Sequence, residues 1–542
     1  MPFVRRRLPA ALLLPLTLAA TTRLAAQHGG HASAPAAADS TMPLYREALG
    51  SYGWKVATAS ADAQAYFDQG VQFMYAFAPD EATRSFREAQ RRDAACAMCA
   101  WGEAWSLGAY LNERMSDADA PAADAAARRA ERLAARNGSA LERDLARAMR
   151  ARYAAKQDSV ARLRLDSAYA RAMGGVHARH PESLEAATLY AEALMLLEPR
   201  RGTWPIERLS VRRIHEVLAG VLAKDVTHPG ACHLYIHATE TTPKAGDAQA
   251  CADRLGLAIP GASHLNHMPS HTYNRVGRWG DAVKANQQAW HSDQKAAVGE
   301  GFAIYPTHNL HMLLFAASMD GQGAVATQAA KDLAKLAPNH NALSLHALVL
   351  LRFGRFDEVL ALEGTPSNPV HRGLLAFARG YAHLRAGRAD SARAVAALVD
   401  SLAAHVPDSV TFRGHTAAKL LGATGGILRG ELLRHAGDTA QGIAALERAV
   451  ALEDSLVYDE PEPLPFSARH WLGAALLESG RAAEAERVYR EALTDHPNNG
   501  WSLFGLAKAL RAQGKADEAA KAQADFDRAW ARADTWMRAS RF

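Results

Sequence analysis

Seven histidines and one glutamate recur at regular spacings near the middle of this sequence. They are His233, His237, Glu240, His264, His267, His271, His308 and His311. Within each set, neighbouring members lie three or four residues apart, which on an α-helix places them on one stripe. A shift of 34 residues carries His233 onto His267. A shift of 44 residues carries His264 onto His308, so the same positions of three successive units carry imidazole.

These residue types suit a transition-metal site. Imidazole-rich sites with few carboxylates favour Zn, Cu or Fe over Mg or Ca, and two histidines four residues apart can share an ion with a ligand from a neighbouring helix. We therefore predict that the phased histidines converge on one metal site, in which Glu240 ligates directly or orients an imidazole. Asn274 stands where the next unit would repeat Glu240, and we expect it to line the same groove.

Two interpretations without a metal remain open. Histidine suits a polar groove that binds peptides, and imidazoles can also hydrogen-bond one another between helices. A third interpretation is a metalloenzyme, hydrolytic or oxidative, that uses the same histidines with Glu240 or Glu460 as the acid/base. The sequence contains no phosphate-binding Gly-rich loop, no Gly-x-Ser-x-Gly elbow and no His-Glu-x-x-His motif, so other catalytic classes are not indicated.

The first cysteine pair, Cys96 and Cys99, forms a Cys-x-x-Cys motif. No histidine follows it and no second such motif exists, which argues against covalent haem and against a zinc ribbon. We predict a local disulfide, as expected in an oxidising compartment. A redox-active pair is the alternative.

The second pair, Cys232 and Cys251, flanks a turn around Thr242–Gly246. Such positions on antiparallel helices can face one another, so we predict a structural disulfide. Metal ligation by a thiolate beside His233 is the alternative.

The elements that must position these residues are helices. The composition is rich in Ala, Leu and Arg, which favour helices. Two distant segments share one pattern of glycine, alanine and an aromatic residue at identical spacings. It comprises Gly70, Ala82, Phe86 and Ala89 in the first segment and Gly473, Ala485, Tyr489 and Ala492 in the second. Glycine permits the tight turn between two helices, alanine lets the helices approach closely at their crossing, and the aromatic residue fills the gap to the next helical hairpin.

These residues resemble the tetratricopeptide repeat (TPR) family over about residues 61–530. The segment His267–His271, of sequence HMPSH, also resembles that of a subgroup of such proteins. The resemblance implies an all-α, right-handed α-solenoid over 61–542, with the first helix of each hairpin lining a concave groove. Insertions near 297–306 and 457–465 interrupt the period, either as lids over the groove or as spacers, and the repeats around 115–205 cannot be phased.

The N-terminus predicts export. Residues 1–26 contain the basic run Arg5–Arg7 and a short apolar stretch before small residues, as in a secretory signal peptide, and 27–60 should be a flexible linker and lead-in. Without the arginines of this segment the chain is nearly neutral, which gives no reason to expect nucleic-acid binding. We expect a periplasmic or secreted protein without membrane insertion. The resemblance implies that its groove holds a protein, peptide or small ligand.

Overall fold

The computed structural model describes residues 42–199, 203–336 and 341–542; the predicted signal peptide and most of the linker lie outside these ranges. Nearly all regular structure within them is α-helical. The strands found there, β1 (Thr411–Phe412) and β2 (His415–Thr416), form one short antiparallel hairpin. None of the helices in these ranges combines the length and the apolar character needed to cross a membrane. The all-α prediction is confirmed.

In the first half of the described chain, the helices follow one another as a series of hairpins. They are α1 (Arg46–Leu49), α2 (Ala61–Tyr75), α3 (Pro79–Arg92), α4 (Ala97–Ser106), α5 (Ala120–Asn137), α6 (Ala140–Arg152), α7 (Ser159–Arg179), α8 (Leu184–Met195), α9 (Leu209–Lys224), α10 (Pro229–Glu240), α11 (Gln249–Ala258), α12 (Ser263–His267), α13 (Pro269–Val276) and α14 (Trp279–Ala296). Two 3-10 turns, η1 (Asp117–Asp119) and η2 (Ala245–Ala248), precede α5 and α11.

The second half continues the series with α15 (Pro306–Met319), α16 (Gly323–Leu336), α17 (Ala342–Arg352), α18 (Phe356–Ala361), α19 (Pro369–Arg385), α20 (Ala389–His405), α21 (Ala417–His435), α22 (Thr439–Asp454), α23 (Arg469–Glu478), α24 (Ala482–Asp495), α25 (Gly500–Ala512) and α26 (Ala516–Ala529). Many helices pack against the next helix and against the next but one, as α19 does with α20 and α21. Such contacts are the pattern of a solenoid built from stacked hairpins.

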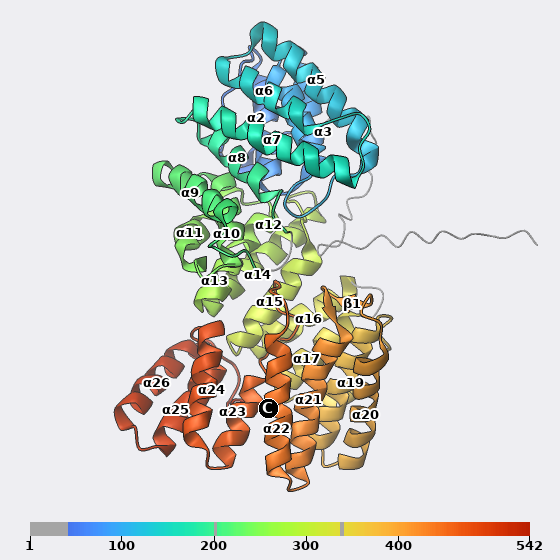
Figure 1. Ribbon diagram of the computed structural model, residues 1–542, viewed down its shortest axis with the longest axis vertical. Helices are drawn as coiled ribbons and strands as arrows, with labels where there is room; N and C mark the ends of the chain where they lie inside the picture. The colour runs from blue at the N-terminus through green and yellow to red at the C-terminus, as the bar shows by residue number, and fades with distance from the viewer. Residues whose placement is uncertain (1–41, 200–202, 337–340) are drawn as a thin grey trace, which may run out of the picture.

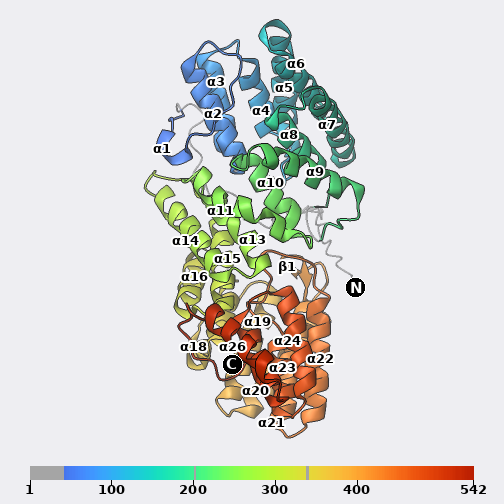
Figure 2. The ribbon, with the colours of Figure 1, turned by 90° about the vertical axis from the view of Figure 1, so that its left-hand side faces the viewer.

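The solenoid is elongated, as Figure 1 and the turned view in Figure 2 show. Helices up to α14 form the upper part, and helices from α17 form the lower part, with α15 and α16 between them. The apolar core has two large clusters of buried residues that meet on α17. Val349 belongs to the first cluster and Leu351 to the second, so opposite sides of one helix join the two parts of the molecule.

The shared glycine-aromatic pattern has a common packing role in both segments. A Cβ atom on Gly70 or on Gly102 would lie within 2.5 Å of the Phe86 ring. On Gly473 or Gly505 it would meet the Tyr489 ring in the same way. Each aromatic ring therefore lies against two glycines, one on the first helix of its own hairpin and one on the first helix of the next hairpin. This contact explains the identical spacings.

Glycines at the hairpin turns have left-handed backbone conformations. Gly277, Gly321 and Gly480, for example, have φ of 72°, 75° and 76°. A side chain is disfavoured at such angles, so glycine ends the first helix and allows the chain to reverse.

Helix lengths are unequal where the repeats could not be phased from sequence. Helices α5, α6, α7 and α8 contain 18, 13, 21 and 12 residues. They still pack as successive pairs. The region is therefore helical as predicted, and its unequal helices explain why no fixed period fits.

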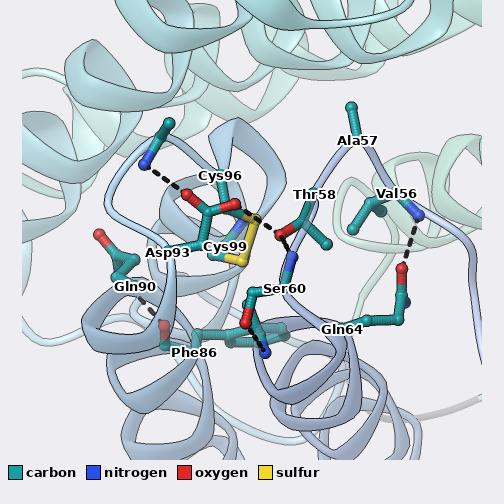
Figure 3. Close-up of a disulfide and its surroundings, with 12 residues drawn as sticks. Val56, Ala57, Thr58, Ser60, Gln64, Phe86, Gln90, Asp93, Cys96 and Cys99 are labelled. Atoms are coloured by element: carbon teal, nitrogen blue, oxygen red, sulfur yellow. Dashed lines mark hydrogen bonds between the residues drawn. A yellow bond between two sulfur atoms is a disulfide. The ribbon is translucent and has the colours of Figure 1, made fainter.

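The described end of the lead-in packs against the first hairpins. Trp54 and Val56 are buried, and Thr58 donates a hydrogen bond to Asp93 at 2.5 Å. Figure 3 shows this bond beside the disulfide of the Cys-x-x-Cys motif. Residues 54–58 thus fix the start of the solenoid to the end of α3.

Candidate metal centre

Four segments bring the predicted ligands together in the middle of the molecule. Helix α10 carries His233, His237 and Glu240 on one stripe. Helices α12 and α13 carry the histidines of the HMPSH segment and His264, and α15 carries His308. The loop after α22 adds Glu460. The histidines in this group are at least nine-tenths buried.

The proline of the HMPSH segment shapes its local structure. Pro269 lacks a backbone N–H group and stands at the first position of α13, so it ends α12 and starts a new helix. His267 and His271 remain four residues apart across this junction, and their Nε2 atoms face each other at 3.1 Å. The two imidazoles therefore remain neighbours although the helix is interrupted between them.

Three histidines form a first possible ligand group, which we call group A: His233, His237 and His264. One ligand atom from each lies within 4.8 Å of the others. The Nδ1 of His233 donates to the main-chain oxygen of Tyr75 at 2.6 Å, because a carbonyl can only accept. Its Nε2 therefore has a lone pair, and it faces the Nε2 of His264 at 3.2 Å.

A second three-histidine set, which we call group B, consists of His267, His271 and His308, again with ligand atoms within 4.8 Å. The Nδ1 of His267 donates a hydrogen bond to the side-chain oxygen of Asn286 at 3.3 Å. The Nε2 of His267 is then directed to His271, as described above. The rings of His267 and His308 have centroids 4.8 Å apart.

Glu240 lies between the two groups and contacts one histidine of each. The Nδ1 of His237 donates to one carboxylate oxygen at 2.7 Å. The Nδ1 of His271 lies 2.5 Å from the other oxygen, and it also contacts Glu460. Carboxylates that hold one imidazole nitrogen in this way orient the other nitrogen toward a metal. The four residues also form a third potential ligand group.

Burial and charge set the protonation of these imidazoles. Burial, aided by the neighbouring imidazole of His271, lowers the pKa of His237 to about 3. The pKa of His233 is lowered well below its usual value, chiefly by burial. Burial also opposes charge on His271, but the carboxylates of Glu460 and Glu240 outweigh it and raise its pKa to about 10. The pKa of Glu460 is raised by burial and by the charge of Glu240.

Aromatic residues with unusual backbone angles enclose the upper side of the centre. Phe77, at φ 59°, stacks parallel to the ring of His237 with centroids 5.9 Å apart. Tyr305, at φ 58°, packs edge-on against His264 and hydrogen-bonds to Tyr110 at 2.7 Å. A positive φ is strained for a bulky residue and is concentrated at functional sites. No motif in the sequence marked these residues or Asn286.

The structure separates His311 from the predicted ligands. It belongs to none of the three ligand groups found in the described residues. One turn along α15 from His308, it stacks on Phe412 of the β1–β2 hairpin, with centroids 6.1 Å apart. Burial and the nearby Arg413 guanidinium hold its pKa well below the usual range. The positive charge of Arg413 also disfavours a metal ion here, so the geometry does not support His311 as a ligand.

Asn274 lies beside the centre rather than in it. It lines a narrow cavity with His271, Arg275, Tyr458 and Glu460, among other residues. Its side-chain oxygen is buried and has no hydrogen-bond partner within the described part of the chain. The cavity reaches the Glu460 side of the centre.

Both cysteine pairs are disulfides in the structure. Cys232 on α10 is bonded to Cys251 on α11, and their Cα atoms lie 5.0 Å apart. Cys96 and Cys99 are bonded at the start of α4. The bond at Cys232 holds the two helices of one hairpin together directly beside His233. It also removes the thiolate that the alternative interpretation would require.

Comparison with known families finds tetratricopeptide repeats in the C-terminal part. Two descriptions of the tetratricopeptide repeat match, one over residues 427–500 and one over 476–525. These ranges run from α21 to α26. Among curated proteins, no significant match to the sequence is found.

Comparison with solved structures finds remote similarity. The TPR domain of P58(IPK) is 13% identical with a TM-score of 0.23, covering 84% of this chain and 100% of that one. Monomeric IFIT1 with Gppp-AAAA is 11% identical with a TM-score of 0.31, covering 87% and 91%. Naa15/Naa10 bound to HypK is 13% identical with a TM-score of 0.23, covering 86% and 70%. The hairpin stack and the repeat matches make this chain an all-α solenoid that contains tetratricopeptide repeats.

Proposed function

We propose that this chain is an exported tetratricopeptide-repeat binding protein that holds transition-metal ions in two adjacent three-histidine sites. Group A forms one site and group B forms the other. The HMPSH segment provides two ligands of group B, and we propose it as the sequence marker of such a centre. Rings of the two groups are direct neighbours, with centroids of His264 and His267 5.2 Å apart.

The observation that carries the proposal is the direction of the imidazole nitrogens. In His233 and His267, the Nδ1–H donates a hydrogen bond to a main-chain or amide oxygen, which leaves Nε2 directed into the group. Glu240 accepts this hydrogen bond from His237, and its other oxygen pairs with the Nδ1 of His271. Packing alone would not require the same arrangement at four histidines, whereas metal binding does.

Buried polar atoms near the centre also fit a cation. The Nε2 of His237 and one oxygen of Glu460 are buried without a hydrogen-bond partner among the described residues. Leaving such an atom unsatisfied costs about 1–3 kcal/mol, more when the group is charged. An ion in group A would satisfy the His237 nitrogen. A site with many imidazoles and few carboxylates suits Cu, Zn or Fe.

The binding role follows from the repeats. Arrays of this kind present extended concave surfaces to protein or peptide ligands. The proposed centre combines histidines from helices of the upper part with Glu460, which comes from the loop between α22 and α23 in the lower part. A metal ion would therefore fix the relative position of the surfaces that bind the partner.

A metal-dependent enzyme, hydrolytic or oxidative, is the second candidate. The narrow cavity beside Asn274 reaches His271 and Glu460, and the Glu460 side chain is 17% exposed. A small substrate or water could approach the centre by this route. Glu460 would then act as the acid/base, whereas Glu240 is fully engaged with two imidazoles.

Metal analysis of purified variants tests the proposal. The protein is equilibrated with Zn²⁺ or Cu²⁺, dialysed, and measured by elemental mass spectrometry. We expect two ions per chain in the native protein, one for each three-histidine group. His308→Ala should lose one ion, and the double variant His237→Ala/His271→Ala should lose both.

The matched control is His311→Ala, on the same helix as His308 but outside both groups. It should retain both ions. Circular dichroism should show unchanged helix content in every variant. Unaltered metal content in the double variant, or equal losses in His308→Ala and His311→Ala, would contradict the proposal.

A further inference from the structure

The last residues of the chain lie in a groove formed by the inner helices of the C-terminal repeats. After α26, residues 535–542 have no helix or strand. Both ribbon views place the C-terminus against the lower helices, close to α23 (Figures 1 and 2). Residues 538–542 contact α19, α21, α23 and α25, the first helices of successive hairpins. We call this surface the tail groove.

An aromatic pocket in the tail groove holds the side chain of Phe542. Its ring packs edge-on against Trp471, with centroids 4.7 Å apart. Tyr381 and Phe466 complete the pocket at 5.5 and 5.9 Å. The Tyr381 hydroxyl also donates to the main-chain oxygen of Phe542 at 2.5 Å. Without the phenyl ring, three aromatic side chains would line an open apolar pocket.

An acidic pair next to the pocket receives Arg541. The guanidinium lies 3.2 Å from a Glu431 oxygen and 2.9 Å from a Glu478 oxygen. Arg434 pairs with the same two carboxylates. Without Arg541, two carboxylates would share one cation. The groove therefore carries a net negative charge at the position where the tail supplies a positive one.

Hydrogen bonds to the tail backbone and to Ser540 complete the fit. Tyr489 bonds to the hydroxyl of Ser540 at 2.7 Å, and this hydroxyl donates to the main-chain oxygen of His470 at 2.7 Å. Lys508 donates to the main-chain oxygen of Arg538. By contrast, Trp536 is 99% exposed. The segment is thus held at a few side chains, as a bound peptide is, and not by continuous secondary structure.

We propose that the tail groove is a docking site for an extended protein segment in which a basic residue directly precedes a bulky aromatic one, and that the tail occupies it as an internal competitor. The partner's aromatic ring takes the place of Phe542. Its basic residue replaces Arg541 between the two carboxylates. The site is separate from the metal centre, so either proposal can fail without the other.

A labelled peptide in trans tests this proposal. The probe is an amidated, fluorescein-labelled peptide with the sequence of residues 536–542, and binding is followed by fluorescence anisotropy. The full chain with Arg541→Ala and Phe542→Ala should bind it at least tenfold more tightly than the native chain, because its own tail no longer competes. Adding Glu431→Gln and Glu478→Gln to that chain should weaken binding at least tenfold.

Two controls make the result decisive. A probe with alanine in place of its last two residues should bind neither protein, and Trp536→Ala in the chain should leave probe binding as in the native protein. Equal probe affinity of native and tail-variant proteins would overturn the proposal. So would a native dimer that dissociates on Phe542→Ala, because the occupant would then be the tail of a second copy.

Hydrogen exchange keeps the proposal testable if the tail variant does not fold. Excess unlabelled probe is added to the native chain, and amide exchange of residues 536–542 is measured by mass spectrometry. Displacement should accelerate exchange in this segment and leave α19–α25 unchanged. Unchanged exchange of the tail at saturating probe would overturn the proposal.

Discussion

The carboxylate of Glu460 contacts the Nδ1 of His271, although the two residues come from different parts of the solenoid. His271 lies on α13, in the upper part, whereas Glu460 lies in the loop between α22 and α23, in the lower part. Arg413 holds this loop in place through the side chain of Asp459 and the main chain of Glu460. A metal centre here would tie the two parts together through one carboxylate.

Replacing Glu460 by glutamine should weaken metal binding without unfolding the protein. The substitution keeps the shape of the side chain but removes the charge that orients His271. Loss of such an orienting carboxylate typically lowers metal affinity about 10–100-fold. Isothermal titration with Zn²⁺ measures the change. Glu462→Gln is the matched control, because Glu462 lies in the same loop but pairs with His496 at 2.8 Å.

The disulfide between α10 and α11 should stabilise the hairpin that carries group A. Closing a loop of 19 residues typically contributes about 3 kcal/mol. The variant Cys232→Ser/Cys251→Ser should therefore unfold at lower denaturant concentration. It should also bind metal more weakly, because His233 is adjacent to the bond. The Cys96–Cys99 bond closes a much shorter loop, so Cys96→Ser/Cys99→Ser should lower the stability less. Ready labelling of Cys232 and Cys251 without reductant would disprove the bond.

Asp293 should make the stability of the protein depend on pH. It is buried on α14 and accepts a hydrogen bond from Asn309, the residue after His308, at 2.8 Å. Burial raises its pKa to about 7 despite this bond. The folded state therefore prefers the protonated acid, and the native protein should lose stability as pH rises from about 4 to about 7, by roughly 1.4 kcal/mol per unit.

Asp293→Asn should remove this dependence, because the amide cannot ionise and its oxygen still accepts from Asn309. Urea unfolding of both proteins between pH 4 and pH 8 measures the difference. The stability gap in favour of the variant should widen up to about pH 7 and then stay constant. Parallel stability curves over the whole range would show that Asp293 titrates as an ordinary surface carboxyl.

Export predicts a defined mature N-terminus. Residues 1–26 have the features of a cleaved secretory signal, and the small residues before Gln27 suit signal peptidase. Mass spectrometry of periplasmic or secreted material should find a chain that starts near Gln27. Cytoplasmic protein with residues 1–26 intact would argue against export.

The phasing of the histidines predicted that most of them lie close together, because helical repeats return the same position to the same face. Offsets of three and four residues placed His233 and His237 on one stripe of α10, and the repeat placed His271 opposite them. His311 follows His308 by three residues, the same kind of spacing, but this helical turn places it beyond the centre, against Phe412. The spacing in the sequence shows which face of a helix a residue occupies. It does not show how far along that helix the neighbouring helix remains in contact.

Contacts between distant segments could not be predicted in the same way. Glu460 was recognised as a possible acid/base in a proline-rich insertion, but its contact with His271 depends on how the whole lower part packs. The hydrogen bond from His233 to Tyr75 depends on the contact between α10 and α2. Neither follows a repeat period, because each joins units that are far apart in the array.

X-ray absorption at the zinc edge tests the central claim most directly. We predict that the zinc-loaded protein has first-shell nitrogen ligands at about 2.0–2.1 Å, with the outer-shell scattering of three imidazole rings per ion. His237→Ala/His271→Ala should abolish this signal. A first shell of oxygens without imidazole scattering, or of sulfur at about 2.3 Å, would contradict the account.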